Sequence, residues 1–132
     1  MLHPNQFHVN EAWIAFQLNA TPVTTDLDGD FNCVSLMDAA SCFMLSSTLI
    51  PAIDKTEPSQ LEARRLLKQA WAHHQTYPAR LILPHGQFAT HLTTAARKLG
   101  IEVVNMPEVD LLPIIGEARE GYEEYMRDGD EH

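Results

Sequence analysis

Two short apolar segments in the second half of the chain, "ARLIL" at 79–83 and "IEVVNM" at 101–106, constrain its fold most strongly. Runs of this length and composition are typical of buried strands. Each follows a segment with helical periodicity: the first begins at Pro58 and Ser59, and the second spans 87–100. The connections "YPAR" and "LGIE" are short, which requires parallel neighbouring strands joined by right-handed crossovers. The second half therefore predicts two parallel strands of an α/β sheet.

The first half has the texture of antiparallel strands. It is rich in β-branched residues and contains hairpin signals, namely the sequence "DG" at 28–29 and a turn near 38–41. We expect three antiparallel strands here, at 21–27, 31–38 and 42–50.

Helices are expected at both ends of this pattern. Asn10 is a suitable N-cap and is followed by large side chains at helical intervals, so residues 10–19 are predicted to form a short helix. A C-terminal helical segment at 108–127 is expected to break around Pro113 and Gly116, because proline interrupts a helix.

Together these elements predict a single α/β domain over residues 1–132. Its mixed sheet has five strands, three antiparallel and then two parallel, flanked by helices. This is the order of the ribonuclease H-like fold.

Within that fold, two stretches resemble the catalytic cores of retroviral-type integrases and related DDE transposases. The hairpin "FNCVSLMDAASCFMLSSTL" is similar to their second and third strands, which run through an Asp-x-x-Ser turn, here Asp38 to Ser41. "YPARLILPHGQFATHLTTAARKLGIEVVNMP" resembles their stretch from the fourth strand, through an acid-Asn-Gly turn and a helix, to a Gly-Ile and the fifth strand. The resemblance covers residues 20–107.

The resemblance implies a site of three carboxylates holding two divalent metal ions, Mg²⁺ or Mn²⁺, for phosphodiester cleavage. The first acid belongs on the first strand, where Asp26 or Asp28 could match. The second would follow "LIL", where this chain has Pro84 and His85. The turn "LPHGQF" thus keeps the shape of the site but lacks the ligand that the two-metal mechanism requires.

The third acid belongs on the helix after the fifth strand, where no family motif selects Glu117 over the other glutamates. A rearranged metal site of Asp26, Asp28 and His85 with Glu117 is one interpretation. In the simpler one, His85 caps or packs at the turn, since the usual zinc patterns, an i, i+4 His pair or a Cys cluster, do not occur.

Charge and composition bear on the partners and the compartment. The chain has 9 basic and 18 acidic residues and a net charge of −9, the opposite of the basic footprint expected for nucleic-acid binding. Seven histidines and clustered basic residues leave nucleic-acid binding open. No run approaches the about 20 apolar residues of a membrane span, and the N-terminus does not resemble a signal peptide, so a cytoplasmic protein is expected.

Cys33 and Cys42 are the only cysteines. If the hairpin is centred between residues 39 and 40, they lie about four positions out of register in the antiparallel pair. Free thiols are therefore expected, with a disulfide as the alternative.

These observations favour a catalytically degenerate integrase-like domain that acts as a binding or interaction module without a cofactor. The alternative is a metal-dependent nuclease or phosphodiesterase in which Asp26, Asp28 and His85 are catalytic. Four large aliphatic residues between 111 and 115 exceed what one helix face hides. A homodimer or another protein partner at the C-terminal helical segment is expected to cover them, unless all four enter the core of the monomer.

Overall fold

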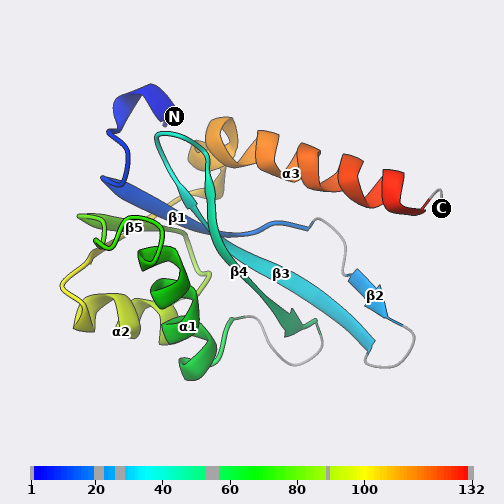
Figure 1. The fold of residues 1–132 in the computed structure, drawn as a ribbon, viewed down its shortest axis with the longest axis horizontal. Coiled ribbons are helices and arrows are strands. Elements are labelled where there is room, and N and C mark those ends of the chain that lie inside the picture. The colour runs from blue at the N-terminus through cyan, green and yellow to red at the C-terminus, as the bar shows by residue number, and fades with distance from the viewer. Residues whose placement is uncertain (1, 20–22, 26–28, 53–56, 89, 131–132) are drawn as a thin grey trace.

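The computed structural model describes residues 2–19, 23–25, 29–52, 57–88 and 90–130 (Figure 1). After a 3₁₀ turn at Pro4–Gln6, the strands are β1 (Ala12–Gln17), β2 (Val23–Thr25), β3 (Gly29–Asp38), β4 (Met44–Pro51), β5 (Arg80–Pro84) and β6 (Glu102–Met106). The helices are α1 (Gln60–Trp71), α2 (His91–Lys98) and α3 (Glu108–Asp130).

The strands form one mixed sheet with β1 at its centre. β1 pairs antiparallel with β3 on one side and parallel with β5 on the other. β4 continues the antiparallel half beyond β3, and β6 continues the parallel half beyond β5. The short β2 pairs with the start of β3, on the edge that β1 occupies further along. The core order β4-β3-β1-β5-β6 confirms the predicted ribonuclease H-like sheet, to which β2 is an addition.

Helices cover both faces of this sheet. α1 and α2 lie on one face, where Leu66 and Leu92 pack with Trp13 of β1 (Figure 1). α3 crosses the other face, where Ile115 packs with Phe16 of β1. The predicted start of α1 is confirmed: Ser59 is its N-cap, and its hydroxyl accepts a hydrogen bond from the Glu62 N–H at 3.1 Å. No helix among the described residues is both long and apolar enough to cross a membrane.

The predicted N-terminal helix at 10–19 is wrong, because this segment contains the central strand β1. Every side chain from Ala12 to Phe16 is buried. A strand covered on both faces shows no alternation of apolar and polar residues. The prediction of a first strand at 21–27 is wrong for the same reason: β1 takes that place, and only β2, at 23–25, lies within the predicted range.

The C-terminal segment also differs from the prediction. α3 is continuous through Pro113, without the break expected there and at Gly116. Leu111 and Ile114 are buried in the core with Ile115, whereas Leu112 is 43% exposed. The aliphatic cluster is thus mostly part of the monomer core, and the argument for a dimer built on these four residues does not hold.

The turn of the β3–β4 hairpin is longer than predicted. β3 ends at Asp38 and β4 begins at Met44, whereas the sequence predicted a turn at 38–41. Leu36 pairs with Ser46, and the register shifts by a bulge before Met37. Cys33 pairs with Leu49, so the two cysteines do not face each other and both are free, as predicted.

Candidate functional site

A polar pocket of about 280 Å³ lies where the carboxyl end of β1, the turn after β5 and the helix α3 meet. The carboxyl ends of strands are where α/β sheets place their ligand sites. The lining residues are Gln17, Asn19, Gln87, Glu108 and Arg119. Glu108 is the one carboxylate among them, and the rest are three amides and a guanidinium.

Arg119 ties the three elements of this pocket together. Its Nη2 lies 2.5 Å from Oε1 of Glu108, and its Nε donates to the backbone carbonyl of Gln17 at 3.0 Å. The guanidinium carbon also lies 5.9 Å from the centre of the Phe16 ring, within the range of a cation–π contact. The Arg119 side chain is only 24% exposed, so its guanidinium interacts mainly with these protein groups and less with water.

The amides of the pocket hold the backbone in place. Gln17 Nε2 donates to the carbonyl of Asn19 at 2.8 Å. Asn19 is buried, and its Oδ1 accepts from the Cys33 N–H at 2.7 Å while its Nδ2 donates to Asn32 Oδ1 at 3.1 Å. These bonds fix the chain leaving β1 against β3.

The turn after β5 positions Gln87 at the pocket. Gln87 N–H donates to the carbonyl of Pro84 at 3.1 Å, and its Nε2 donates to Glu108 Oε2 at 3.3 Å. Phe88 is buried in a left-handed conformation, with φ of 54°, and its carbonyl accepts from the Thr93 hydroxyl at 3.3 Å.

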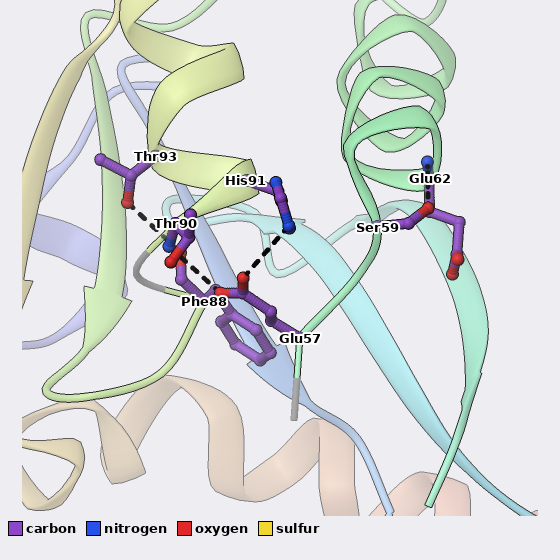
Figure 2. Close-up of polar contacts among 7 residues, drawn as sticks. All are labelled: Glu57, Ser59, Glu62, Phe88, Thr90, His91 and Thr93. Carbon is purple, nitrogen blue, oxygen red and sulfur yellow. Dashed lines mark hydrogen bonds and ion pairs between the residues drawn. The ribbon is translucent and has the colours of Figure 1, made fainter. Parts of the chain in front are cut away.

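Glu57, in the segment just before α1, contacts Thr90 and His91 on the far side of this turn (Figure 2). Its Oε2 accepts from the Thr90 N–H at 3.1 Å, and its Oε1 lies 3.7 Å from His91 Nε2 at the first residue of α2. A carboxylate at a helix N-terminus satisfies a free N–H and interacts favourably with the helix dipole. The turn bearing Gln87 is therefore held by the segment before α1 as well as by α2.

β1 offers no acid to this pocket. The residues of β1 are Ala, Trp, Ile, Ala, Phe and Gln, and the last side chain on the face toward α3 is Phe16, which is fully buried. Because β1 (Ala12–Gln17) is the first strand, the predicted placement of Asp26 and Asp28 on the first strand is wrong, while their role as metal ligands stays a prediction. Asp26 and Asp28 themselves lie outside the described residues.

The structure does not bring the other two predicted ligands together. His85 is exposed, and its N–H donates to the Met106 carbonyl at 2.9 Å, which joins β5 to β6. Glu117 is exposed on α3 and acts electrostatically on the Cys42 thiol, in the turn after β3. Within the described part of the chain, no group of three His, Cys, Asp or Glu side chains could hold a metal ion.

The Asp-x-x-Ser turn, in contrast, is formed as the sequence indicates. Asp38 is 1% exposed, and its carboxylate accepts from the Asn10 N–H at 2.7 Å, the Ser41 N–H at 2.9 Å and the Ser41 hydroxyl at 2.7 Å. Asn10 also links the turn to Trp13, whose indole N–H donates to Asn10 Oδ1 at 2.7 Å. Asn10, which the sequence predicts as a helix N-cap, is instead part of this hydrogen-bond network at the start of β1.

Sequence reasoning named none of the five pocket residues as a site. Glu108 directly follows Pro107 at a helix start, and Arg119 is one of two basic residues after residue 98, the other being Arg127. Those two facts could have marked an ion pair on α3. Gln17, Asn19 and Gln87 form no motif, because amides belong to no fixed catalytic spacing.

No protein-family model matches the chain, and no curated protein matches its sequence. Solved structures do resemble it. The simian T-cell lymphotropic virus intasome in complex with PP2A regulatory subunit B56 gamma superposes with a TM-score of 0.57 at 19% identity, over 97% of this chain. The chain spans only 43% of that protein's length.

Two further structures contain catalytic cores alone. The HTLV-2 integrase catalytic core domain in complex with magnesium, in its dimeric form, gives a TM-score of 0.52 at 13% identity over 83% of this chain and 82% of its own. The catalytic core domain of BIV integrase gives 0.52 at 13% identity, over 90% of this chain and 68% of its own. With its sheet order and its covering helices, the chain has the ribonuclease H-like fold of retroviral integrase catalytic cores.

Proposed function

We propose that this chain is a catalytically degenerate integrase-like domain that acts as a binding or interaction module. One observation carries the proposal: the pocket where β1, the turn after β5 and α3 converge is lined by three amides and by Arg119, which is paired with Glu108. A two-metal phosphodiesterase needs several carboxylates at such a convergence, because they bind the metal ions and neutralise their charge.

The residues present do not fit a pair of divalent cations. Among the described residues that line the pocket, Glu108 is the single carboxylate, and the Arg119 guanidinium already neutralises it. A fixed positive charge beside a dication raises the energy of the bound ion, since like charges repel. The neutral amides of Gln17 and Gln87 supply too little negative charge to offset this repulsion.

The test is a nuclease assay with Mg²⁺ or Mn²⁺ on single-stranded, duplex and hybrid nucleic acid. We expect no cleavage. Cleavage that is lost in Asp26→Ala but kept in Asp30→Ala, an exposed acid on β3, would establish the alternative of a rearranged Asp, His and Glu nuclease site and refute the proposal.

The same proposal extends to the partners of the domain. The similar structures include a magnesium complex in dimeric form and a complex with a regulatory subunit, and each of these properties belongs to that protein. For this chain we propose protein–protein contact, including self-association through α3, ahead of nucleic-acid binding. The net charge of −9 supports this order, because a phosphate backbone repels an acidic surface.

A further inference from the structure

The polar pocket has hydrogen-bonding groups that its own contacts do not use. Gln17 and Gln87 each donate through Nε2, to the Asn19 carbonyl and to Glu108. Arg119 donates through Nε to the Gln17 carbonyl and contacts Glu108 through Nη2. Within the described ranges, no hydrogen bond engages the side-chain carbonyl oxygen of either glutamine or Nη1 of Arg119. The pocket therefore offers two acceptors and one donor group to a ligand.

These three groups are open to solvent. In the described part of the chain, Glu62 Oε2 is the only buried side-chain nitrogen or oxygen atom without a partner, and it lies on α1, outside the pocket lining. The unused atoms of Gln17, Gln87 and Arg119 are thus not enclosed in the protein. A ligand in the pocket has direct access to them.

The side chains that carry these groups are already held in place. Gln87 Nε2 lies 3.3 Å from Glu108, Glu108 contacts the Arg119 guanidinium, and Arg119 Nε lies 3.0 Å from the Gln17 carbonyl. Holding side chains before binding lowers the entropic cost of binding. The charge of Glu108 also cancels that of Arg119, so the described lining has no net charge and favours a neutral ligand.

The volume of the pocket suits a single side chain. At about 280 Å³ it lies just below the range of about 300 to 1,000 Å³ that is typical of sites enclosing a whole small-molecule ligand. A side chain presented by another protein needs less room, because the rest of the partner stays outside the pocket.

A primary carboxamide matches the pattern of unused groups. Its NH₂ group donates twice and its carbonyl oxygen accepts. The two N–H donors pair with the side-chain carbonyl oxygens of Gln17 and Gln87, and the carbonyl oxygen accepts from Arg119 Nη1. A carboxylate has no donor, so its oxygens would face two carbonyl oxygens. An ammonium group has no acceptor and is repelled by the guanidinium.

We propose that this pocket binds the carboxamide side chain of a glutamine or asparagine on a partner protein. The inference rests on the proposed role as an interaction module and names the chemical group that the module recognises.

An NMR titration with N-acetyl-glutamine N-methylamide, whose only primary amide is its side chain, tests the proposal. We expect saturable shifts of the side-chain amide signals of Gln17 and Gln87 and of the Arg119 Nε–H signal, with a Kd of about 1 to 10 mM for so small a probe. The corresponding glutamate and methionine compounds are expected to bind about tenfold more weakly or worse at neutral pH, because they bring no donor to the two carbonyl oxygens.

Gln87→Lys replaces an acceptor of the pocket with a positively charged donor. It is expected to reverse the preference of the pocket, so that the glutamate compound binds about tenfold more tightly than the glutamine compound. A misfolded variant would lose binding of both compounds and would not reverse the preference. Gln69→Lys is the matched control, since Gln69 is exposed on α1 and does not line the pocket, and it is expected to keep the wild-type preference.

No saturable shift up to about 100 mM of the glutamine compound would overturn the inference, since that is about ten times the weakest expected Kd. Equal affinity for the three compounds, or a wild-type preference in Gln87→Lys, would also overturn it. Cytidine or adenosine binding more tightly than the glutamine compound would assign the pocket to a nucleobase instead. The nuclease assay is separate: cleavage refutes the proposed loss of catalysis, whereas a failed titration refutes only the recognised group.

Discussion

Arg119 lies 2.5 Å from Glu108 on the same helix, although the two residues are eleven positions apart. In a straight α-helix their Cα atoms would be about 16 Å apart, farther than the two side chains can bridge. α3 remains one helix, but its axis must depart from a straight line for these side chains to meet; Pro113 lies between them, and a proline removes one backbone hydrogen bond and crowds the preceding turn.

Arg119→Met is expected to destabilise the domain by about 1 to 2 kcal/mol, because it removes a partly buried ion pair and the bond to the Gln17 carbonyl. Glu108 is 37% exposed, so the coupling energy of the pair in a double-mutant cycle with Glu108→Gln should stay below about 1 kcal/mol. Urea denaturation of the four proteins measures both values. A cost of Arg119→Met equal to that of the exposed Arg97→Met would show that Arg119 does not hold the site together.

The polar pocket can be tested by rebuilding its charge. Gln17→Asp, Gln87→Asp and Arg119→Gln together would place three carboxylates, with Glu108, around the 280 Å³ pocket. We expect this triple variant to bind Mn²⁺ in isothermal titration calorimetry and the wild type not to, because oxygen-rich, net negative sites favour hard dications. Binding of equal strength by both proteins would place the metal elsewhere and contradict the account of this pocket.

The Asp38 carboxylate is expected to be the most sensitive polar group of the fold. Asp38→Ala leaves the N–H groups of Asn10 and Ser41 without their acceptor in a part-buried turn, which should cost about 2 to 4 kcal/mol. Ser41→Ala removes only the hydroxyl donor and should cost about 1 kcal/mol. Thermal melting resolves the difference, at roughly 4 °C for each kcal/mol in a domain of this size. Equal melting temperatures for the two variants would contradict the network.

Cys42 gives a prediction in pH. Burial raises the pKa of its thiol above the ordinary value, and the carboxylates of Glu117 and Asp38 raise that pKa further. The thiolate is the reactive form, so alkylation by iodoacetamide should be slow at neutral pH and should accelerate only as the pH rises through the raised pKa.

Glu117→Gln removes one of the two negative charges and should move the alkylation profile of Cys42 to lower pH without restoring the ordinary value, because burial remains the larger cause. Glu123→Gln is the matched control on the same helix. Cys33 is 8% exposed and should be alkylated much more slowly in the folded protein. A profile unchanged by Glu117→Gln would exclude the electrostatic contribution.

Glu57 provides a test of how the turn bearing Gln87 is held. Glu57→Ala removes the acceptor for the Thr90 N–H and the ion pair with His91, and should cost about 1 kcal/mol, as the loss of an N-terminal cap does. Hydrogen exchange should accelerate at the Thr90 amide. Glu57→Gln keeps an acceptor without the charge, so its exchange rate at the Thr90 amide should fall between those of the wild type and Glu57→Ala. Equal protection in all three proteins would show that Glu57 does not hold this turn.

The second half of the fold was predictable because each of its elements has a local signal. Ser59 is a helix N-cap, and Gly100, with φ of 79°, adopts the left-handed conformation directly after the C-cap Leu99 and ends α2. The short connections then left only parallel pairing for β5 and β6. β1 has no such signal, since a strand buried on both faces and the start of an apolar helix look alike over six residues.

The candidate site was less predictable than the fold. The absence of an acid after β5 is visible in the sequence, but the residues that fill its place are not. Gln17 and Arg119 meet across 102 residues of chain, and only the packing of α3 on β1 brings them together. The wrong prediction at β1 also placed Asp26 and Asp28 on the first strand, which is in fact Ala12–Gln17.

The central position of β1 also sets the order in which the sheet can form. The β3–β4 hairpin closes over a few residues, whereas Ala12 of β1 meets its parallel partner Arg80 only 68 positions later in the chain. Loop closure of that length is entropically costly and slow compared with a hairpin. During synthesis β1 therefore has one unpaired edge until β5 emerges. An apolar strand with a free edge is a template for the wrong pairing, so this interval is when the chain most depends on protection from aggregation.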